Sequence, residues 1–401
     1  MPRTRTAGRL RPTTTTTTRR TATLCVRSSH IPDVEHVSLD ELFDAYYSCR
    51  KNKRNTDSAL RYELNFIANN ERLYEELNRQ TYEIGRSTAF CVRFPKVREV
   101  FAADFRDRIV HHLVVNRLGE CFEQEMLDCA YACRKGKGVL YGVRDVQRQM
   151  AAAGGDAWYA KCDIEGFFMS IDRQVLFGEV ERILGKYGIG DTAWWLWLLR
   201  KIIFNRPEWN CEVRGDRTLW DVLPPNKSLF HSGGRGLPIG NLTSQVFANV
   251  YLSIFDRWMA GQLPDGGYGR YVDDFIIIHR DKQKVIEMVE RAHTCLKGEL
   301  GLTLHPRKLT IQQVRRGVRF AGIMIKGHCQ YPSRRLVKGA FDAADGITRK
   351  GSIVESINSR FGLMRHTCSY NLRRRIWRKL SATYKGKYIC YNFKKIKERK
   401  L

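Results

Sequence analysis

The chain has 401 residues, 43% of them hydrophobic, which is enough for a core and for roughly two or three packed subdomains. Its 69 Lys and Arg residues outnumber its 42 Asp and Glu residues, and the formal net charge is +27. Repulsion among so many positive charges opposes a compact fold, which argues against an enzyme of small metabolites. A polyanionic partner would offset this repulsion, because each neutralised phosphate releases counterions. No apolar run reaches the ~20 residues of a membrane-spanning helix, so we expect a soluble, cytoplasmic protein that binds nucleic acid and no membrane.

The N-terminal residues 1–37 are predicted to form a disordered basic tail. Residues 1–32 contain no Asp or Glu, several arginines and a run of threonines, a composition that a transit peptide would share. Folded structure is expected to begin at Ser38, which can form a helix capping box with Glu41. A further helix is predicted over residues 57–79, with an apolar stripe made of Leu60, Leu64, Ile67, Tyr74 and Leu77.

The rest of the chain alternates short apolar strands with helices, which indicates an α+β fold. A strand pair interrupted by Pro95 is predicted over residues 88–100, and a helix follows over residues 108–122. In the middle of the chain, strands are expected at residues 158–163, 268–271, 275–279, 309–313 and 318–325. Helices are expected between them at residues 173–186, 241–263 and 282–300. Beyond Ser333 the pattern becomes helical and increasingly basic.

The 12 cysteines are scattered and include no CxxC pair. Cys129 and Cys133 are the closest pair, but no second pair of ligands at zinc-finger spacing accompanies them. We therefore expect buried or idle thiols in a reducing compartment and no zinc site.

The strongest local signal is the Asp273–Asp274 pair between two apolar strand-like runs. Adjacent carboxylates repel each other unless a cation lies between them, and hard oxygen ligands suit Mg²⁺. A solvated turn is the alternative, but it would not need buried strands on both sides. A third carboxylate, Asp163, ends the strand predicted at residues 158–163. We expect Asp163, Asp273 and Asp274 to be the catalytic residues and to bind two Mg²⁺ ions, with Mn²⁺ as a possible substitute.

The order of these segments resembles the palm of a reverse transcriptase over roughly residues 85–330. Residues 163–168 resemble the first catalytic motif of that family, and Tyr-Val-Asp-Asp at residues 271–274 resembles the second. Residues 301–308 resemble the following motif, which ends in Lys308, and residues 320–322 resemble the primer-grip turn. The resemblance implies that Phe168 is a steric gate against the 2′-hydroxyl of a ribonucleotide. A plain core phenylalanine is the alternative.

Residues 236–245 indicate which subgroup of reverse transcriptases the chain resembles. Their sequence is Gly-Leu-Pro-Ile-Gly-Asn-Leu-Thr-Ser-Gln. Most reverse transcriptases carry Gln at the position of Ile239 and end this motif in Ser-Pro rather than in Ser244-Gln245. With residues 223–230 before it, this variant resembles the reverse transcriptases of diversity-generating retroelements. The glycines are expected to let the loop approach the templating base pair, with Ile239 and Gln245 at the nucleotide.

Three basic segments are expected to contact substrate. Lys96 and Arg98 resemble fingers residues that hold the triphosphate, with solvated hairpin charges as the alternative. Arg134, Lys135 and Lys137 are interspersed with two glycines and are expected to follow the template backbone, unless they form only a flexible basic loop. The last segment, residues 371–401, is predicted to be a thumb helix along the template–primer duplex, with simple solubilising charge as the alternative. Its expected nucleic-acid contacts are Arg373, Arg374, Arg375, Arg378 and Lys379.

The sequence therefore predicts a right-hand polymerase. We expect a tail (1–37), N-terminal helices and fingers (38–157), a palm with the catalytic site (158–330) and a short basic thumb (331–401), without an RNase H or endonuclease domain. The expected reaction is RNA-templated addition of deoxynucleoside triphosphates. The resemblance implies error-prone cDNA synthesis, a small basic oligomeric accessory protein and a bacterial or phage origin. A retron-like or group II intron-like reverse transcriptase and a catalytically idle RNA-binding scaffold are the alternatives.

Overall fold

A four-stranded antiparallel sheet in the order β5-β6-β3-β7 forms the base of the molecule in the computed structural model, which describes residues 35–51, 56–94, 96–348 and 352–399. The central strands are β3 (Trp158–Asp163) and β6 (Asp274–His279), and the outer strands are β5 (Gly267–Tyr271) and β7 (Thr310–Gln313). All neighbouring strands are antiparallel. The predicted α+β class is confirmed, and these strands start and end within one residue of the predicted positions.

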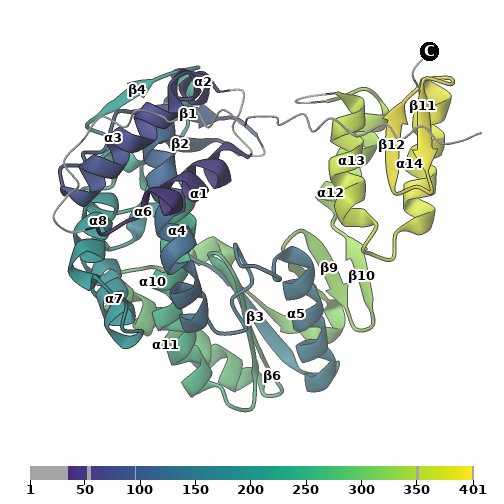
Figure 1. Ribbon diagram of the computed structural model, residues 1–401. Coiled ribbons are helices and arrows are strands. Elements are labelled where there is room, and N and C mark those ends of the chain that lie inside the picture. Colours follow the sequence, from purple (N-terminus) through teal and green to yellow (C-terminus); the bar gives the residue numbers. More distant parts are fainter. Residues whose placement is uncertain (1–34, 52–55, 95, 349–351, 400–401) are drawn as a thin grey trace, which may run out of the picture.

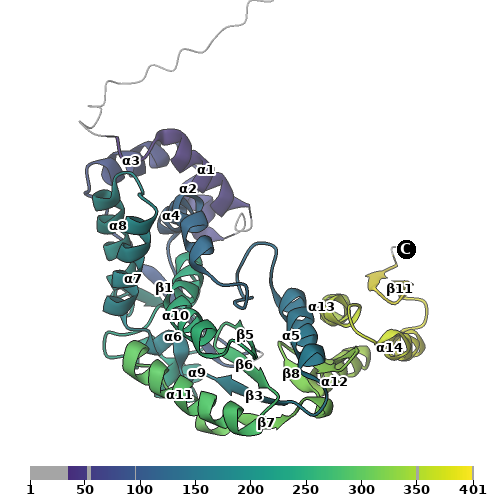
Figure 2. The ribbon, with the colours of Figure 1, turned by 90° about the horizontal axis from the view of Figure 1, so that it is seen from below.

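Side chains of β6 alternate between two hydrophobic clusters, so this strand is buried on both faces. Phe275 and Ile277 belong to the main core, and Ile276 and Ile278 belong to a second cluster. The main core is covered by α10 (Leu242–Gln262) and α11 (Lys282–Leu300), and the second cluster by α5 (Val139–Ala153). Figures 1 and 2 show the sheet between α11 and α5. The central strand β6 is thus held by packing on both sides.

The N-terminal helices pack on the long helix α4 (Phe105–Glu125). The capping box of Ser38 and Glu41 at the start of α1 (Leu39–Arg50) is confirmed. The helix predicted over residues 57–79 is instead divided into α2 (Asp57–Glu63) and α3 (Phe66–Asn78). The predicted stripe is wrong in its first half, because α2 buries Ala59 and Tyr62 instead and a new helix begins at Phe66. Three of its members are exposed: Leu60, Leu64 and Ile67.

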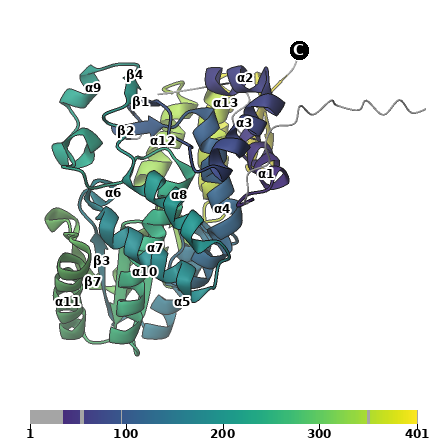
Figure 3. The same cartoon turned by 60° about the vertical axis from the view of Figure 1, so that its left-hand side comes forward.

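The fingers contain a small sheet in the order β2-β1-β4, in which β1 (Ser87–Val92) pairs with β2 (Arg98–Ala102) and β4 (Cys211–Val213). Pro95 lies outside the described residues. Helices between β3 and β5 connect this sheet to the palm, and Figure 3 shows α7, α8 and α10 side by side. The remaining elements of this region are α6 (Phe167–Ser170), α7 (Arg173–Lys186), α8 (Thr192–Phe204), α9 (Thr218–Asp221) and the 3-10 turns η1 (Pro225–Lys227) and η2 (Leu229–His231).

A three-stranded antiparallel sheet leads from the palm to the C-terminal region. It consists of β8 (Val318–Phe320), β9 (Ile323–Lys326) and β10 (Cys329–Pro332), and the 3-10 turns η3 (Pro306–Lys308) and η4 (Val314–Arg316) flank β7. The strand predicted over residues 318–325 is therefore two strands. Ala321 and Gly322 form the turn between them, both with positive φ.

The C-terminal region has a hydrophobic core of its own and lies across from the fingers in Figure 1. Its helices are α12 (Arg334–Ala344), α13 (Ile353–Met364) and α14 (Tyr370–Thr383). The prediction of helix to the C-terminus is wrong, because β11 (Tyr388–Tyr391) and β12 (Lys395–Glu398) form an antiparallel hairpin. Of the tail predicted over residues 1–37, residues 1–34 lie outside the described part. No helix among the described residues is long and apolar enough to cross a membrane.

Candidate active site

Three carboxylates meet at one end of the palm sheet. Asp163, the last residue of β3, is the cross-strand partner of Asp274, the first residue of β6. Asp273 lies in the turn between β5 and β6, which the pairing of Tyr271 with Asp274 closes. The carbonyl oxygen of Asp273 accepts a hydrogen bond of 3.1 Å from the amide of Ile164, directly after Asp163. Residues 110 positions apart in the chain are thereby brought together as the sequence predicted.

The turn that carries Asp273 is strained. Val272 has a φ of +57°, which a β-branched residue rarely adopts and which costs of order 1–3 kcal/mol. The surrounding structure holds this conformation, since the guanidinium of Arg270 donates a hydrogen bond of 3.0 Å to the carbonyl oxygen of Val272. Strain of this kind fixes the direction of the neighbouring carboxylate.

Arg270 is itself fixed by a buried ion pair that the sequence analysis missed. Its guanidinium contacts both carboxylate oxygens of Asp256 on α10, at 2.8 and 2.5 Å, and both side chains are buried. The hydroxyl of Tyr268 donates to the same carboxylate at 2.7 Å, and the amide oxygen of Asn249 accepts a 3.3 Å bond from Arg270. One feature of the sequence could have indicated this ion pair: Arg270 is a charged residue in an otherwise apolar strand, just before the paired aspartates.

Electrostatics at the carboxylates are unfavourable without a cation. Burial, together with the charges of Asp163 and Asp274, raises the pKa of Asp273 to about 6. Two lysines compensate part of this charge. The ammonium group of Lys161 lies 2.7 Å from Asp274 Oδ1, and that of Lys308 pairs with Asp163 Oδ1. Lys308, expected to act at the nucleotide, thus contacts Asp163, one of the predicted catalytic carboxylates, directly.

The donor set fits a hard divalent cation by its chemistry, because it consists of carboxylate oxygens, and burial and the neighbouring charges already raise the pKa of Asp273. In the described part of the chain, no three His, Cys, Asp or Glu side chains already lie together as a metal site, and Cys129 and Cys133 form none. Asp163 and Asp274 are each engaged by a lysine. A cation would replace these ammonium groups as the partner of the carboxylates.

Phe168 and Ile239, both predicted at the nucleotide, pack against the same small hydrophobic cluster. Its buried members are Ala89, Phe101, Met169 and Leu229. Both side chains are partly exposed. The carbonyl of Phe168 accepts a 2.8 Å bond from the amide of Leu237, and that of Ile239 accepts a 2.8 Å bond from Phe101. These contacts join the first catalytic motif, the residue 236–240 loop and the fingers sheet.

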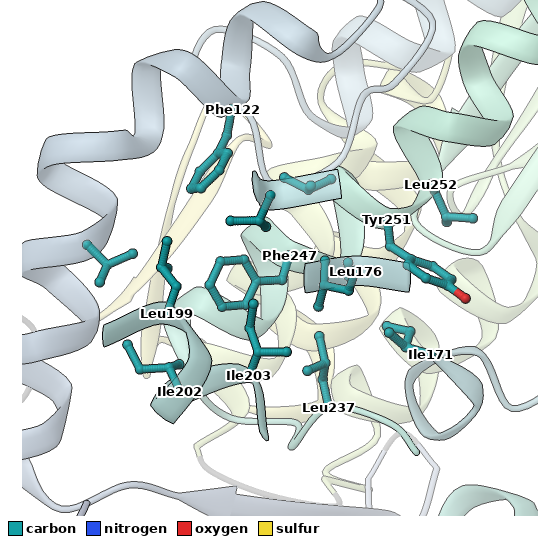
Figure 4. Close-up of a cluster of buried hydrophobic side chains, with 14 of the residues drawn as sticks. Phe122, Ile171, Leu176, Leu199, Ile202, Ile203, Leu237, Phe247, Tyr251 and Leu252 are labelled. Atoms are coloured by element: carbon teal, nitrogen blue, oxygen red, sulfur yellow. The ribbon is translucent and has the colours of Figure 1, made fainter. Parts of the chain in front are cut away.

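The glycines of the 236–240 loop approach protein backbone, and the expected approach of the loop to the templating base pair stays a prediction. An added Cβ at Gly236 would lie 2.8 Å from the Cα of Met169, and one at Gly240 would lie 2.8 Å from the carbonyl oxygen of Phe101. Their φ angles of +83° and +129° also exclude most other residues. Leu237 between them is buried in the main core (Figure 4). The loop therefore packs closely against Met169 on the palm side and against Phe101 of the fingers sheet.

The other residues predicted at the nucleotide are exposed. Lys96 lies in the connection between β1 and β2, Arg98 begins β2, and Gln245 is in the first turn of α10. Their positions leave their side chains accessible to a ligand.

Two of the predicted template contacts point into the protein instead. The side chain of Arg134 is only 5% exposed and donates to Glu123 and to main-chain carbonyls at the end of α4, including those of Met126 and Ala130. Lys137 pairs with Asp128 at 2.6 Å. A guanidinium that satisfies the last carbonyls of a helix is not free for phosphate. Of this group, Lys135 is the exposed cation.

The basic helix α14 also has an inner and an outer side. Arg373 is buried, with hydrogen bonds to Ser369 Oγ and to the carbonyl of Phe393, so its predicted role as a duplex contact is wrong. Lys379 is exposed but pairs with Asp345 at 2.6 Å. The exposed arginines of the helix are Arg374, Arg375 and Arg378.

Comparison with known proteins places these features in a family. The family model described as reverse transcriptase (RNA-dependent DNA polymerase) matches residues 95–325. Protein YkfC of Escherichia coli (strain K12) is 22% identical over 280 residues, which cover 60% of this chain and 67% of that protein. The Putative COX1/OXI3 intron 1 protein of Saccharomyces cerevisiae is 22% identical over 172 residues, which cover 42% of this chain but only 18% of that protein.

Solved structures similar to this chain include two telomerases. The telomerase from Candida albicans, in complex with a fragment of telomeric RNA, has a TM-score of 0.44 and 11% identity, over 75% of this chain and 55% of that one. The apo telomerase from Candida tropicalis has a TM-score of 0.44 and 10% identity, over 75% of this chain and 59% of that one. The chain thus spans little more than half the length of these telomerase chains.

Proposed function

Because the chain belongs to the reverse transcriptase family, whose model matches residues 95–325, we propose that it is an RNA-directed DNA polymerase. The observation that carries the proposal is the meeting of Asp163, Asp273 and Asp274 at one end of the palm sheet, with the pKa of Asp273 raised to about 6 by burial and by the other two carboxylates. A site that holds three carboxylates at such electrostatic cost is suited to divalent cations.

The three aspartates would hold two Mg²⁺ ions, for which Mn²⁺ is a possible substitute. When bound, the cations would lower the pKa of the primer 3′-hydroxyl and stabilise the leaving pyrophosphate. The protein supplies a fixed arrangement of ligands. The β3–β6 register positions Asp163 and Asp274, and the strained turn with its Arg270 contact positions Asp273. Lys161 and Lys308 neutralise the carboxylates before substrate arrives.

Nucleotide selection would depend on the fingers side of the site. Phe168 follows Asp163 by one short turn and would exclude a 2′-hydroxyl by its ring. Lys96 and Arg98 are exposed and could hold the triphosphate, with Lys as a point charge and Arg as a planar fork. Ile239 and Gln245 would line the nucleotide-binding site. The side chain of Ile239 has no hydrogen-bond donor or acceptor, so it would contribute only its shape and dispersion contacts.

Template and primer would be held mainly by charge. The exposed Arg374, Arg375 and Arg378 on α14, together with Lys135 in the connection between α4 and α5, are suited to phosphate contacts that do not depend on base sequence. Lys379 could join them if it released Asp345. The buried Arg134 and Arg373 are left out of this proposal.

The motif with Ile239 and Ser244-Gln245 supports a finer proposal, error-prone cDNA synthesis in a diversity-generating retroelement with a small basic oligomeric accessory protein. The alternatives are an intron-type enzyme and a retron-like enzyme. Between these two, the similarity to a yeast protein named for an intron favours the intron-type enzyme. Neighbouring DNA distinguishes them: a near-identical repeat pair that differs at adenines supports the retroelement.

Primer extension by the purified protein on an RNA template tests the main proposal. We expect addition of dNTPs that requires Mg²⁺ and stops with a chelator. A protein that binds RNA but adds no nucleotide under any divalent cation would be an idle scaffold, and the proposal would fail.

A further inference from the structure

Glu99, the second residue of the fingers strand β2, is fully buried and accepts three hydrogen bonds from one segment of the chain. The amide of Leu229 donates to Oε1 at 2.6 Å, and the hydroxyl of Ser228 and the indole nitrogen of Trp220 donate to Oε2 at 2.8 and 2.7 Å. A buried carboxylate is costly unless its lone pairs are satisfied, and these donors satisfy it. All three donors lie about 120 to 130 positions away in the sequence, within residues 218–231, hereafter the supporting segment.

The supporting segment lies directly against the turn that connects Asp163 to Phe168. Gly166 in this turn has a φ of +55°, and an added Cβ there would lie 2.6 Å from the carbonyl oxygen of Asn226. The side-chain amide of Asn226 donates to Glu165 Oε1 at 3.2 Å. Backbone in such close contact leaves the turn little freedom to move unless the supporting segment moves as well.

The same segment completes the cluster on which the nucleotide-facing side chains rest. Leu229 is one of its four buried members, and Trp220 packs on it together with Phe168 and Ile239. Glu99 therefore fixes two residues of the cluster, Trp220 and Leu229, through hydrogen bonds, while Phe168 and Ile239 are held by packing on that cluster.

We propose that Glu99 is a positioning residue for nucleotide selection, which acts by holding the supporting segment against Phe168 and Ile239. The inference rests on the proposed polymerase function and assigns a determinant of sugar discrimination outside the catalytic motifs. Glu99 touches neither the nucleotide nor the catalytic carboxylates. Its effect is transmitted through Trp220 and Leu229 to the ring of Phe168.

Glu99→Gln tests the role with almost no change in volume. A carboxamide has one acceptor oxygen and one donor NH₂, so in either orientation its NH₂ faces an N–H group, that of Leu229 or that of Trp220. The supporting segment should shift, and Phe168 with it. We expect the ratio of kcat/KM for dNTP to that for rNTP to fall by roughly tenfold, because displacements well under 1 Å are enough to weaken steric exclusion.

Two milder variants guard against a failure to fold. Trp220→Phe keeps the ring and Ser228→Ala keeps the backbone, while each removes one donor to Glu99. Both should lower the discrimination ratio in the same direction by a smaller factor. The control is Glu125→Gln, which disturbs another buried carboxylate that binds Tyr187 and Lys186 between α4 and α7, outside the cluster. It should lower stability and leave the ratio unchanged.

The decisive arm is a double-mutant cycle with Phe168→Ala. If Glu99 acts through Phe168, Glu99→Gln should change the ratio by less than about twofold in the Phe168→Ala background. Two outcomes would overturn the inference without affecting the proposed function. One is an equal effect of Glu99→Gln in both backgrounds, and the other is an unchanged ratio in active Glu99→Gln, Trp220→Phe and Ser228→Ala enzymes. A wild-type protein that adds no nucleotide would instead overturn the proposed function.

Discussion

Asp163 and Asp274 are cross-strand partners in the antiparallel pair of β3 and β6, so the register of the palm sheet itself sets the relation between two carboxylates of the candidate site. A slip of one residue would turn one of them to the opposite face. Burial of β6 on both faces opposes such a slip, because Phe275 and Ile277 belong to one core and Ile276 and Ile278 to another. The site is thus built on packing rather than on a flexible loop.

Asp256→Ala should strongly destabilise the protein. The substitution leaves the fully buried guanidinium of Arg270 without its counter-charge, a loss of about 3–5 kcal/mol in the free energy of unfolding. Urea unfolding measures it. The control is Asp342→Ala, which removes an exposed pair with Lys338 and should cost no more than about 0.5 kcal/mol. Equal, small losses in both variants would mean that the Arg270 pair does not hold the strained turn.

Phe168→Ala should admit ribonucleotides, because removal of the ring opens space for the 2′-hydroxyl. The measurement is the ratio of rNTP to dNTP incorporation on an RNA template. Phe167→Leu is the matched control, since Phe167 is the buried neighbour of Phe168 and should affect stability more than selectivity. An active Phe168→Ala enzyme with the wild-type ratio would mean that Phe168 is a plain core residue and not a steric gate.

Replacement of Arg374, Arg375 and Arg378 by Gln should weaken binding to RNA–DNA duplex and flatten its salt dependence. These side chains are exposed on α14, so the fold should persist. Each lost phosphate contact lowers the slope of log K against log salt by about 0.7–0.9. Arg373→Gln is the contrasting variant, because Arg373 is buried and its loss should lower stability instead. An unchanged slope in the triple variant would mean that these charges only solvate the surface.

Much of the fold could be predicted from local signals. Residues 173–186 and 282–300 form α7 and α11 as predicted, because a regular apolar period follows the capping carboxylates of Asp172 and Asp281. The three aspartates of the candidate site were recognisable because charges at the ends of buried strands are unusual. Whether they bind metal and carry out catalysis stays a prediction.

What escaped prediction depends on partners distant in the sequence. Nothing near Arg373 indicates that its side chain turns inward, since one accepting carbonyl, that of Phe393, lies 20 residues further along the chain. The same holds for Glu99, whose partners lie more than 100 residues away. Local periodicity also failed at Leu64, where a helix break exposes an apolar stripe.

Ile239→Gln should raise fidelity. An amide at this position could form a hydrogen bond with a correctly paired nucleotide, worth about 0.5–1.5 kcal/mol, which corresponds to a two- to tenfold gain in discrimination. Single-nucleotide insertion opposite all four template bases measures it, and the retroelement proposal expects the largest gain opposite adenine. Unchanged misincorporation in an active mutant would show that Ile239 only packs against the cluster around Phe101.

Metal-dependent nucleotide addition by Asp273→Asn and Asp274→Asn tests the central claim most directly. Each substitution removes a carboxylate charge with little change in volume, and Asp273→Asn also removes a buried charge whose burial and repulsion by Asp163 and Asp274 raise the pKa of Asp273 to about 6. Both proteins should therefore remain folded and bind RNA. We predict that wild-type protein extends a primer on an RNA template with Mg²⁺, whereas neither mutant does. Wild-type rates of extension by both mutants would contradict the assignment of the catalytic site.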